Sequence, residues 1–209
     1  DLRSGCAVSS VSTDEQQHVI DAASRDDSGN TDATIVSASF KLDATDPTLS
    51  PALSVAGPVL VGQAGVTAMA SAADAPSGVA SSSCGSVDTS TPGVHTVSCT
   101  ATDNAGNEAS ATLTYVVQYR ILGFFSPVPL SKWKVGQTVP VKIALSNATG
   151  TRISDAEAAT LAQACRVSFE TSGAQSRGQD CMKYDGAYDQ FVYNWKLGKG
   201  GTGPATIVV

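Results

Sequence analysis

Apolar and polar residues alternate along residues 95–102 and again along residues 110–117. This period of two is typical of β-strands with one buried and one exposed face. Between the two runs stands the turn sequence Asp103-Asn-Ala-Gly-Asn107. The pattern predicts two antiparallel strands joined by a turn, in which Thr96 and Thr100 face outward. The residues predicted to point inward are Val97, Cys99, Ala101, Ala111, Leu113, Tyr115 and Val117.

The same unit occurs a second time, nearer the N-terminus. Four residues recur at one constant offset: His18, Asp26, Gly29 and Asn30 correspond to His95, Asp103, Gly106 and Asn107. The aspartates of this turn motif are expected to accept hydrogen bonds from nearby backbone N–H groups, and the Gly-Asn pairs tolerate positive φ. The inward positions of this copy are Ile20, Ala22, Val36, Ala38 and Phe40. The repeat predicts tandem β-sandwich units.

Turn residues and composition divide the chain into three parts. Residues 1–45 read as a partial immunoglobulin-like repeat and residues 46–118 as a complete one. Residues 119–209, where aromatic residues gather, read as a further β-sandwich domain. The predicted fold is therefore all-β, built of tandem immunoglobulin-like β-sandwiches. The strands expected in the second and third parts are 52–56, 66–72, 79–83, 94–102, 110–118, 138–146, 166–171, 190–197 and 205–209.

One short helix is expected in the C-terminal domain, over residues 155–164. Ser154 and Glu157 have the spacing of a capping box, which satisfies backbone N–H groups at a helix start. Later in this domain, Phe191, Tyr193, Trp195 and Leu197 alternate along one strand face. Such a stripe is usually sandwich core. The alternative is a carbohydrate platform, for which Trp133, in an expected loop, is the better exposed candidate.

Charge and motifs exclude several classes of function. The chain has 209 residues, a net charge of −6 and only 13 Lys and Arg residues, with no basic cluster, so nucleic acid is not an expected partner. No apolar run approaches the ~20 residues that cross a bilayer. Neither a Gly-x-Ser-x-Gly nor a His-Glu-x-x-His motif occurs. We expect no enzyme activity and no cofactor.

The five cysteines favour an oxidising compartment. Cys84 and Cys99 flank one turn region, and Cys165 and Cys181 flank another, so each pair is a candidate local disulfide that stabilises by about 3 kcal/mol in the chain-entropy model. Cys6 is left without a partner, and no zinc-ligand spacing occurs. We therefore expect an extracellular location, either secreted or at the cell surface.

A minority hypothesis concerns calcium. Asp43 and Asp46 lie in the expected linker, and Asp103 and Asp26 lie at the two turns. Carboxylates are the hard oxygen ligands that Ca²⁺ prefers. Aspartates also serve turns without any metal, so the turn role remains the first interpretation.

Two family resemblances cover most of the chain. Residues 46–118 resemble the bacterial extracellular immunoglobulin-like repeats of the HYR-like kind, through Pro47-Thr48, Ser77-Gly78-Val79, Gly93-Val-His95 and Cys99-Thr-Ala-Thr-Asp-Asn-Ala-Gly-Asn107. Residues 119–209 resemble the PxKF domain of bacterial secreted proteins, through Pro140, Lys142 and Ile143, with Ile in place of Phe. The aromatic strand Tyr188-Asp-Gln-Phe-Val-Tyr-Asn-Trp-Lys196 also matches. The first resemblance implies spacer or adhesive modules without catalytic residues.

The sequence thus predicts a non-catalytic spacer or anchoring module of a larger secreted or cell-surface bacterial protein. The expected partners of this module are the adjacent domains of the parent chain. Three alternatives stay open: a carbohydrate-binding or adhesive module, an accessory tail of a secreted hydrolase, and a subunit of a polymerising surface assembly. The last follows from the expectation that the chain begins inside one sandwich and ends one strand early in another. Such open edges favour strand addition between copies.

Overall fold

The computed structural model describes residues 17–22, 36–128, 134, 136–171, 179–196 and 205–208. These residues form an all-β, sandwich-like structure with one short helix, as the sequence predicts. They fall into two compact units. The first comprises residues 1–54, 67–87 and 96–113, and the second comprises residues 55–66, 88–95 and 114–209. The strands β9 (Gly93–Asp103) and β10 (Glu108–Gln118) contribute residues to both units.

The first described elements are β1 (Gln17–Ala22) and β2 (Val36–Lys41), which form an antiparallel pair in the first unit. The first copy of the repeat predicts two strands, near residues 17–25 and 33–42, and both observed strands fall within these ranges. The turn motif Asp26, Gly29 and Asn30 lies outside the described residues, as does Cys6, and the inward side chains of this copy are not described.

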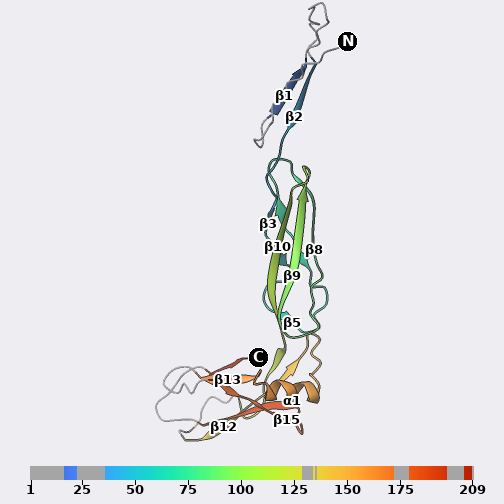
Figure 1. Cartoon of the computed structure of the whole chain (residues 1–209). Helices are drawn as coiled ribbons and strands as arrows, with labels where there is room; N and C mark the ends of the chain where they lie inside the picture. The colour runs from blue at the N-terminus through green and yellow to red at the C-terminus, as the bar shows by residue number, and fades with distance from the viewer. Residues whose placement is uncertain are drawn as a thin grey trace, which may run out of the picture. The chain divides into compact units, whose positions relative to one another are not determined.

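The long strands β9 and β10 neighbour each other in a four-stranded sheet of order β5-β10-β9-β8, in which β8 (Val79–Cys84) is an edge (Figure 1). Val97, Cys99 and Ala101 are buried, whereas Thr96 and Thr100 are exposed. The alternation therefore predicts the faces of β9 correctly. On β10, Tyr115 and Val117 are buried and Leu113 is half-buried.

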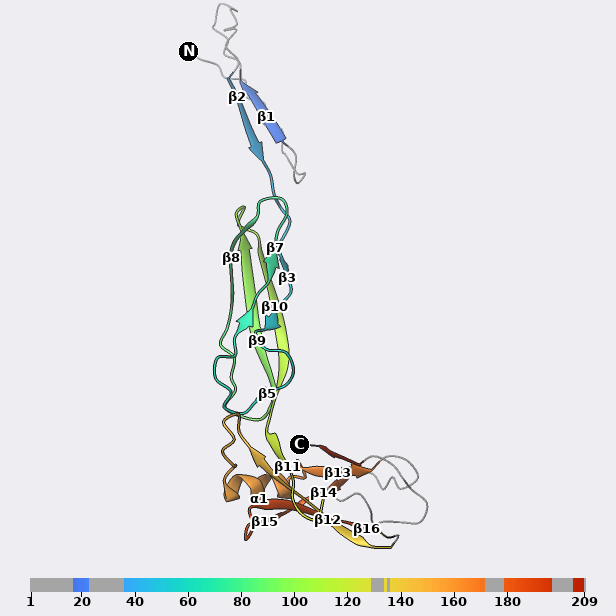
Figure 2. The ribbon, with the colours of Figure 1, turned by 180° about the vertical axis from the view of Figure 1, so that it is seen from behind.

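Two short antiparallel pairs belong to the first unit. They are β3 (Thr48–Leu49) with β7 (Ala72–Ala73), and β4 (Ala52–Leu53) with β6 (Ala68–Met69), and Figure 2 shows β3 and β7 together. The sequence predicts one continuous strand over residues 66–72. Instead, Ser71 has a φ of 45°, between β6 and β7. A positive φ interrupts the extended backbone, so the stretch pairs with two partners rather than one.

In the second unit, β5 (Val59–Leu60) pairs in parallel with the end of β10. A four-stranded sheet then has the order β11-β12-β16-β15, and a three-stranded sheet has the order β14-β13-β17. The bounds are β11 (Arg120–Phe124), β12 (Thr138–Ser146), β13 (Ser168–Thr171), β14 (Gln179–Cys181), β15 (Lys183–Asp185), β16 (Gln190–Lys196) and β17 (Ala205–Val208).

The helix α1 (Asp155–Gln163) begins where the capping box predicts. The backbone N–H of Glu157 donates to the Ser154 hydroxyl over 3.3 Å, which satisfies one of the free donors of the first turn. Ala158 is fully buried and joins the core of the second unit. The helix therefore covers that core with its small apolar face.

Tyr193 and Trp195 pack against the core of the second unit. Among the described residues, this core contains Tyr119, Val141, Ile143, Leu145, Ile153, Ala158, Val167, Phe169, Met182 and Phe191. Phe169 stacks on Tyr193 with ring centroids 4.6 Å apart. The alternating aromatics of β16 are thus core, as their spacing indicates. Trp133 and Leu197 lie outside the described residues.

Both cysteine pairs expected from the spacing are disulfide-bonded. Cys84 on β8 lies opposite Cys99 on β9, and their disulfide joins neighbouring strands of the first unit. Cys165, just after α1, is bonded to Cys181 on β14 in the second unit. Within the described part of the chain, no helix has the length and apolar character needed to cross a membrane.

Candidate cation-binding site

Three loops of the first unit, residues 42–46, 74–78 and 103–107, each contribute one aspartate to a cluster: Asp43, Asp74 and Asp103. Asp103 organises its loop most completely. Its Oδ1 accepts hydrogen bonds from the backbone N–H groups of Ala105, Gly106 and Asn107 at 2.8, 2.7 and 2.8 Å. Its Oδ2 accepts from the side-chain amide of Asn107 at 2.7 Å. This is the turn role predicted from the Asp-Asn-Ala-Gly-Asn sequence.

Asp103 is also buried, with an exposed fraction of 2%. Burial raises the pKa of its carboxyl, but the donors on Asn107 and on the two residues before it outweigh burial and hold the pKa below its usual value. Asp103 therefore stays charged inside the unit at neutral pH. Gly106, with a φ of 97°, supplies the left-handed turn that aims these N–H groups at the carboxylate.

Asp74 organises the second loop in a similar way. Its Oδ2 accepts from the backbone N–H of Ser77 at 3.1 Å, from the Ser77 hydroxyl at 3.2 Å and from the N–H of Gly78 at 2.8 Å. The side chain of Asn104 then donates to the carbonyls of Ser77 and Gly78, each at 2.9 Å. The second and third loops are thereby bonded to each other.

Asn107 joins the third loop to the first. Its side-chain amide lies 3.3 Å from the carbonyl oxygens of Asp43 and Thr45. The Oδ1 of Asp43 accepts the Thr45 N–H at 3.0 Å. The Oδ2 of Asp43 is different: it is buried, with less than 1 Å² exposed, and it has no hydrogen-bond partner among the described residues.

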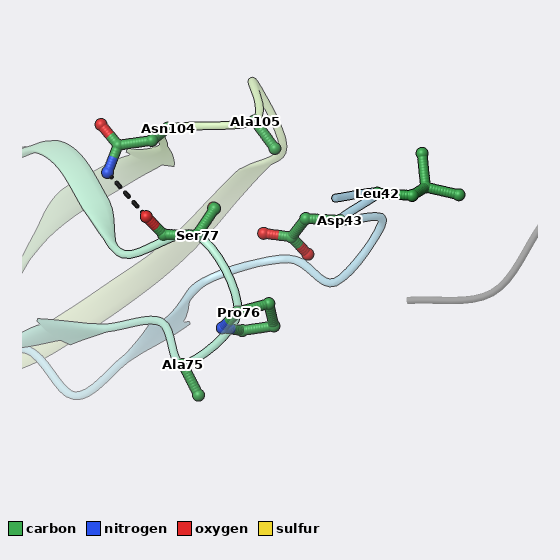
Figure 3. A pocket seen from close by; sticks show the side chains of 7 residues that line it. All are labelled: Leu42, Asp43, Ala75, Pro76, Ser77, Asn104 and Ala105. Carbon is green, nitrogen blue, oxygen red and sulfur yellow. Dashed lines mark hydrogen bonds between the residues drawn. The ribbon is translucent and has the colours of Figure 1, made fainter. Parts of the chain in front are cut away.

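The loops bring the carboxylates of Asp43, Asp74 and Asp103 together. One oxygen from each lies within 4.8 Å of the others. Among the residues whose side chains the structure describes, no Lys, Arg or His forms an ion pair with any of them. Asp43 also lines a cleft of about 600 Å³ together with Pro76 and Ser77. Figure 3 shows its carboxylate directed toward the loop that carries these two residues.

Three hard oxygen donors with net negative charge are the chemistry of a site for a divalent cation. The structure brings together two of the four aspartates named in the calcium hypothesis, Asp43 and Asp103. Asp46 is exposed and outside the cluster, and Asp26 lies outside the described residues. Asp74 is the residue that sequence reasoning missed. Its stretch Asp74-Ala-Pro-Ser-Gly78 reads as a turn, and only the fold places it beside the other two.

The remaining sequence candidates serve the fold. His95 stacks on Tyr115 with centroids 5.5 Å apart, and its Nε2 lies 2.9 Å from the carbonyl of Thr91. Its Nδ1 is 4.0 Å from Asp88, whose pKa is lowered chiefly by hydrogen bonds from Ser90. These contacts fix the loop before β9.

The motif residues of β12 also have structural positions. Ile143 is fully buried in the core, and Pro140 and Lys142 are half-buried. Among the described residues, the ladder of β11 and β12 ends at Ile143, and the Phe125 N–H just after β11 donates to the Lys142 carbonyl over 3.0 Å. Pro140 lies beyond that point, where β11 needs no backbone donor from it.

Comparisons of the chain with protein-family models, with curated proteins and with solved structures found no match. The site must therefore be interpreted from its own residues.

Proposed function

We propose that this chain is a non-catalytic extracellular structural module, which spaces or anchors the other domains of a larger secreted or cell-surface bacterial protein. The observation that carries the proposal is how the polar side chains are used. Asp103, Asp74 and Asn104 direct their polar atoms into their own or neighbouring loops. Groups used in this way hold loops in place rather than act on a substrate.

Two further features support the proposal. Each unit has a disulfide that closes a short loop, which suits a protein that meets an oxidising environment and must persist there. The likeness of residues 46–118 to HYR-like repeats and of residues 119–209 to PxKF domains points to the same setting. Repeats of the first kind act as spacers or adhesive modules.

The test is an exchange of modules in the full-length parent protein. A spacer contributes length and stability but no specific surface, so replacing residues 1–209 by unrelated sandwich domains of equal total length should keep the parent's activity and surface display. Deleting the same residues should reduce display. Loss of activity in the exchanged protein, with normal display, would contradict the spacer proposal.

The carbohydrate alternative needs a direct measurement with the 209-residue chain. On a glycan array, a spacer gives no saturable binding. Tyr188 is the most exposed aromatic residue among those described, at 72%, so Tyr188→Ala is the matched variant for any signal that appears. Saturable binding that Tyr188→Ala abolishes would replace the spacer proposal with a carbohydrate-binding function.

A further inference from the structure

We propose that Asp43, Asp74 and Asp103 bind one Ca²⁺ ion and so join three loops of the first unit. This inference goes beyond the spacer proposal and does not depend on it. The first step is the charge of the cluster. Three carboxylates have oxygens within 4.8 Å of one another, and no basic side chain that the structure describes pairs with them. Without a cation, the folded chain must bear this repulsion between like charges.

The second step is the orphaned oxygen of Asp43. Its Oδ2 has less than 1 Å² exposed and lacks a hydrogen-bond partner in the part of the chain that the structure describes. A buried carboxylate oxygen that has lost its water and gained no donor is costly. The Oδ1 of the same group is already bonded to the Thr45 N–H. A cation among the three carboxylates supplies the missing partner.

The third step is the choice of ion. Ca²⁺ takes oxygen ligands at about 2.3–2.6 Å, so ligands on opposite sides of one ion are roughly 4.6–5.2 Å apart. The three carboxylate oxygens are at most 4.8 Å apart, so one ion can reach all of them. Ca²⁺ also accepts irregular geometry with 6–8 ligands, whereas Mg²⁺ requires a nearly ideal octahedron. The cleft of about 600 Å³ beside Asp43 leaves room for the waters that would complete the shell.

The bound ion would act as a cross-link. Asp43 lies in the segment between β2 and β3, Asp74 follows β7, and Asp103 ends β9. Two hydrogen bonds of 3.3 Å from Asn107 connect the first loop to the third. These lie beyond the usual N–H···O range, so the ion would add a stronger link between the two loops.

The experiment uses the 209-residue chain with CaCl₂ as the only added ligand. Isothermal titration calorimetry should give one site per chain with a Kd of about 10⁻⁴–10⁻³ M, the range of extracellular calcium modules. The midpoint of thermal unfolding should rise with Ca²⁺ concentration and fall in EGTA, because a ligand that binds only the folded state stabilises it. MgCl₂ at equal concentration should produce a much smaller shift.

Asp43→Asn is the decisive variant, because the amide keeps the size of the side chain and the oxygen that accepts the Thr45 N–H. It should weaken Ca²⁺ binding at least about tenfold, since the site loses a charged ligand. In EGTA the same variant should unfold at a higher temperature than wild type, because one of three repelling charges is gone. A purely structural role for Asp43 predicts the opposite sign in EGTA.

Asp46→Asn is the matched control: Asp46 is an exposed aspartate of the same segment, outside the cluster. It should bind Ca²⁺ like wild type. The proposal is overturned if wild type shows no saturable heat and no shift at about 10 mM Ca²⁺, tenfold above the weakest affinity expected. It is also overturned if Asp43→Asn responds as wild type does, or if Mg²⁺ acts as well as Ca²⁺. If a proton shared between the carboxylates relieves their repulsion in place of a cation, wild type should show no saturable heat and no shift.

Discussion

The interiors of the two units are built from different side chains. Among the described residues of the second unit, the largest fully buried side chains are Phe191, Ile143, Leu145 and Met182. In the first unit, the fully buried residues include Asp103 and the disulfide-bonded Cys99. Large apolar side chains stabilise by the area that they remove from water. A buried carboxylate stabilises only through the donors, or the cation, that it holds. The first unit should therefore depend on specific bonds, and the second on packing.

The largest effect should come from the core of the second unit. Phe191→Ala should destabilise that unit by about 3–5 kcal/mol, because the aromatic side chain leaves a cavity among Ile143, Phe169 and their neighbours. Hydrogen-exchange mass spectrometry resolves the two units. Amides of β12 and β16 should exchange faster, while those of β8 should keep their wild-type rates.

The control is Tyr188→Ala, which removes an aromatic ring that is 72% exposed and should leave exchange unchanged. If Phe191→Ala accelerates amide exchange in β8 as strongly as in β12, the two units unfold together. The difference between their interiors then does not produce a difference in stability.

The next effect concerns the disulfide of the first unit. Replacing Cys84 and Cys99 together by Ala should cost about 3 kcal/mol, from the 15-residue separation that the bond closes. The matched variant replaces Cys165 and Cys181, which close a separation of 16 residues. Similar loop lengths predict similar costs in both units.

The comparison between units is sharpened by measuring how much amide protection each double variant loses. The first unit, whose described interior holds fewer large apolar side chains, should lose more of its native amide protection than the second after the same loss of about 3 kcal/mol. Equal losses of protection would show that packing supports the two units equally.

The helix cap gives a smaller effect. Ser154→Ala removes the hydroxyl that accepts the Glu157 N–H and should destabilise the second unit by about 1 kcal/mol. Chemical denaturation followed by circular dichroism measures the loss. Ser154→Asp keeps an acceptor at the N-cap and should restore most of the stability. If Ser154→Asp is no better than Ser154→Ala, the cap does not stabilise α1.

Sequence patterns predict the long elements of this fold because their signals are local. The alternation around Val97 and Cys99 determines which face of β9 is buried, and Ser154 determines where α1 begins. The short strands β3, β5, β14 and β15 were not predicted, because two or three residues carry no measurable period. Their pairing depends on partners distant in the chain.

The acidic cluster also combines residues with a local sequence signal and a residue without one. Asp43 and Asp103 were predicted as candidate ligands because each stands in a recognisable turn or linker. Asp74 is 31 residues from the first and 29 from the second in the sequence. Nothing local distinguishes it from an ordinary turn aspartate, and only the pairing of β3 with β7 brings its loop to the other two.

The smallest change in stability at neutral pH is expected at Tyr119, whose hydroxyl forms a hydrogen bond inside the second unit. Tyr119 is 4% exposed, and its hydroxyl donates to the carboxylate of Glu157. Burial first, and the bond to Glu157 second, raise the pKa of Tyr119 well above its ordinary value. Tyr119→Phe keeps the packed ring, so it should cost less than about 1 kcal/mol at pH 7.

Alkaline pH separates this polar bond from the packing around it. The raised pKa means that the unfolded chain releases the Tyr119 proton first, near pH 10, while the folded chain still holds it. Stability from this group is therefore fully present below about pH 10 and declines as the pH rises toward the folded pKa. Denaturant unfolding between about pH 9 and 11 should show a shallower decline for Tyr119→Phe than for wild type. Tyr188→Phe, at an exposed tyrosine, should follow wild type. If Tyr119→Phe declines as steeply as wild type, Tyr119 and its bond to Glu157 do not account for the loss of stability at alkaline pH.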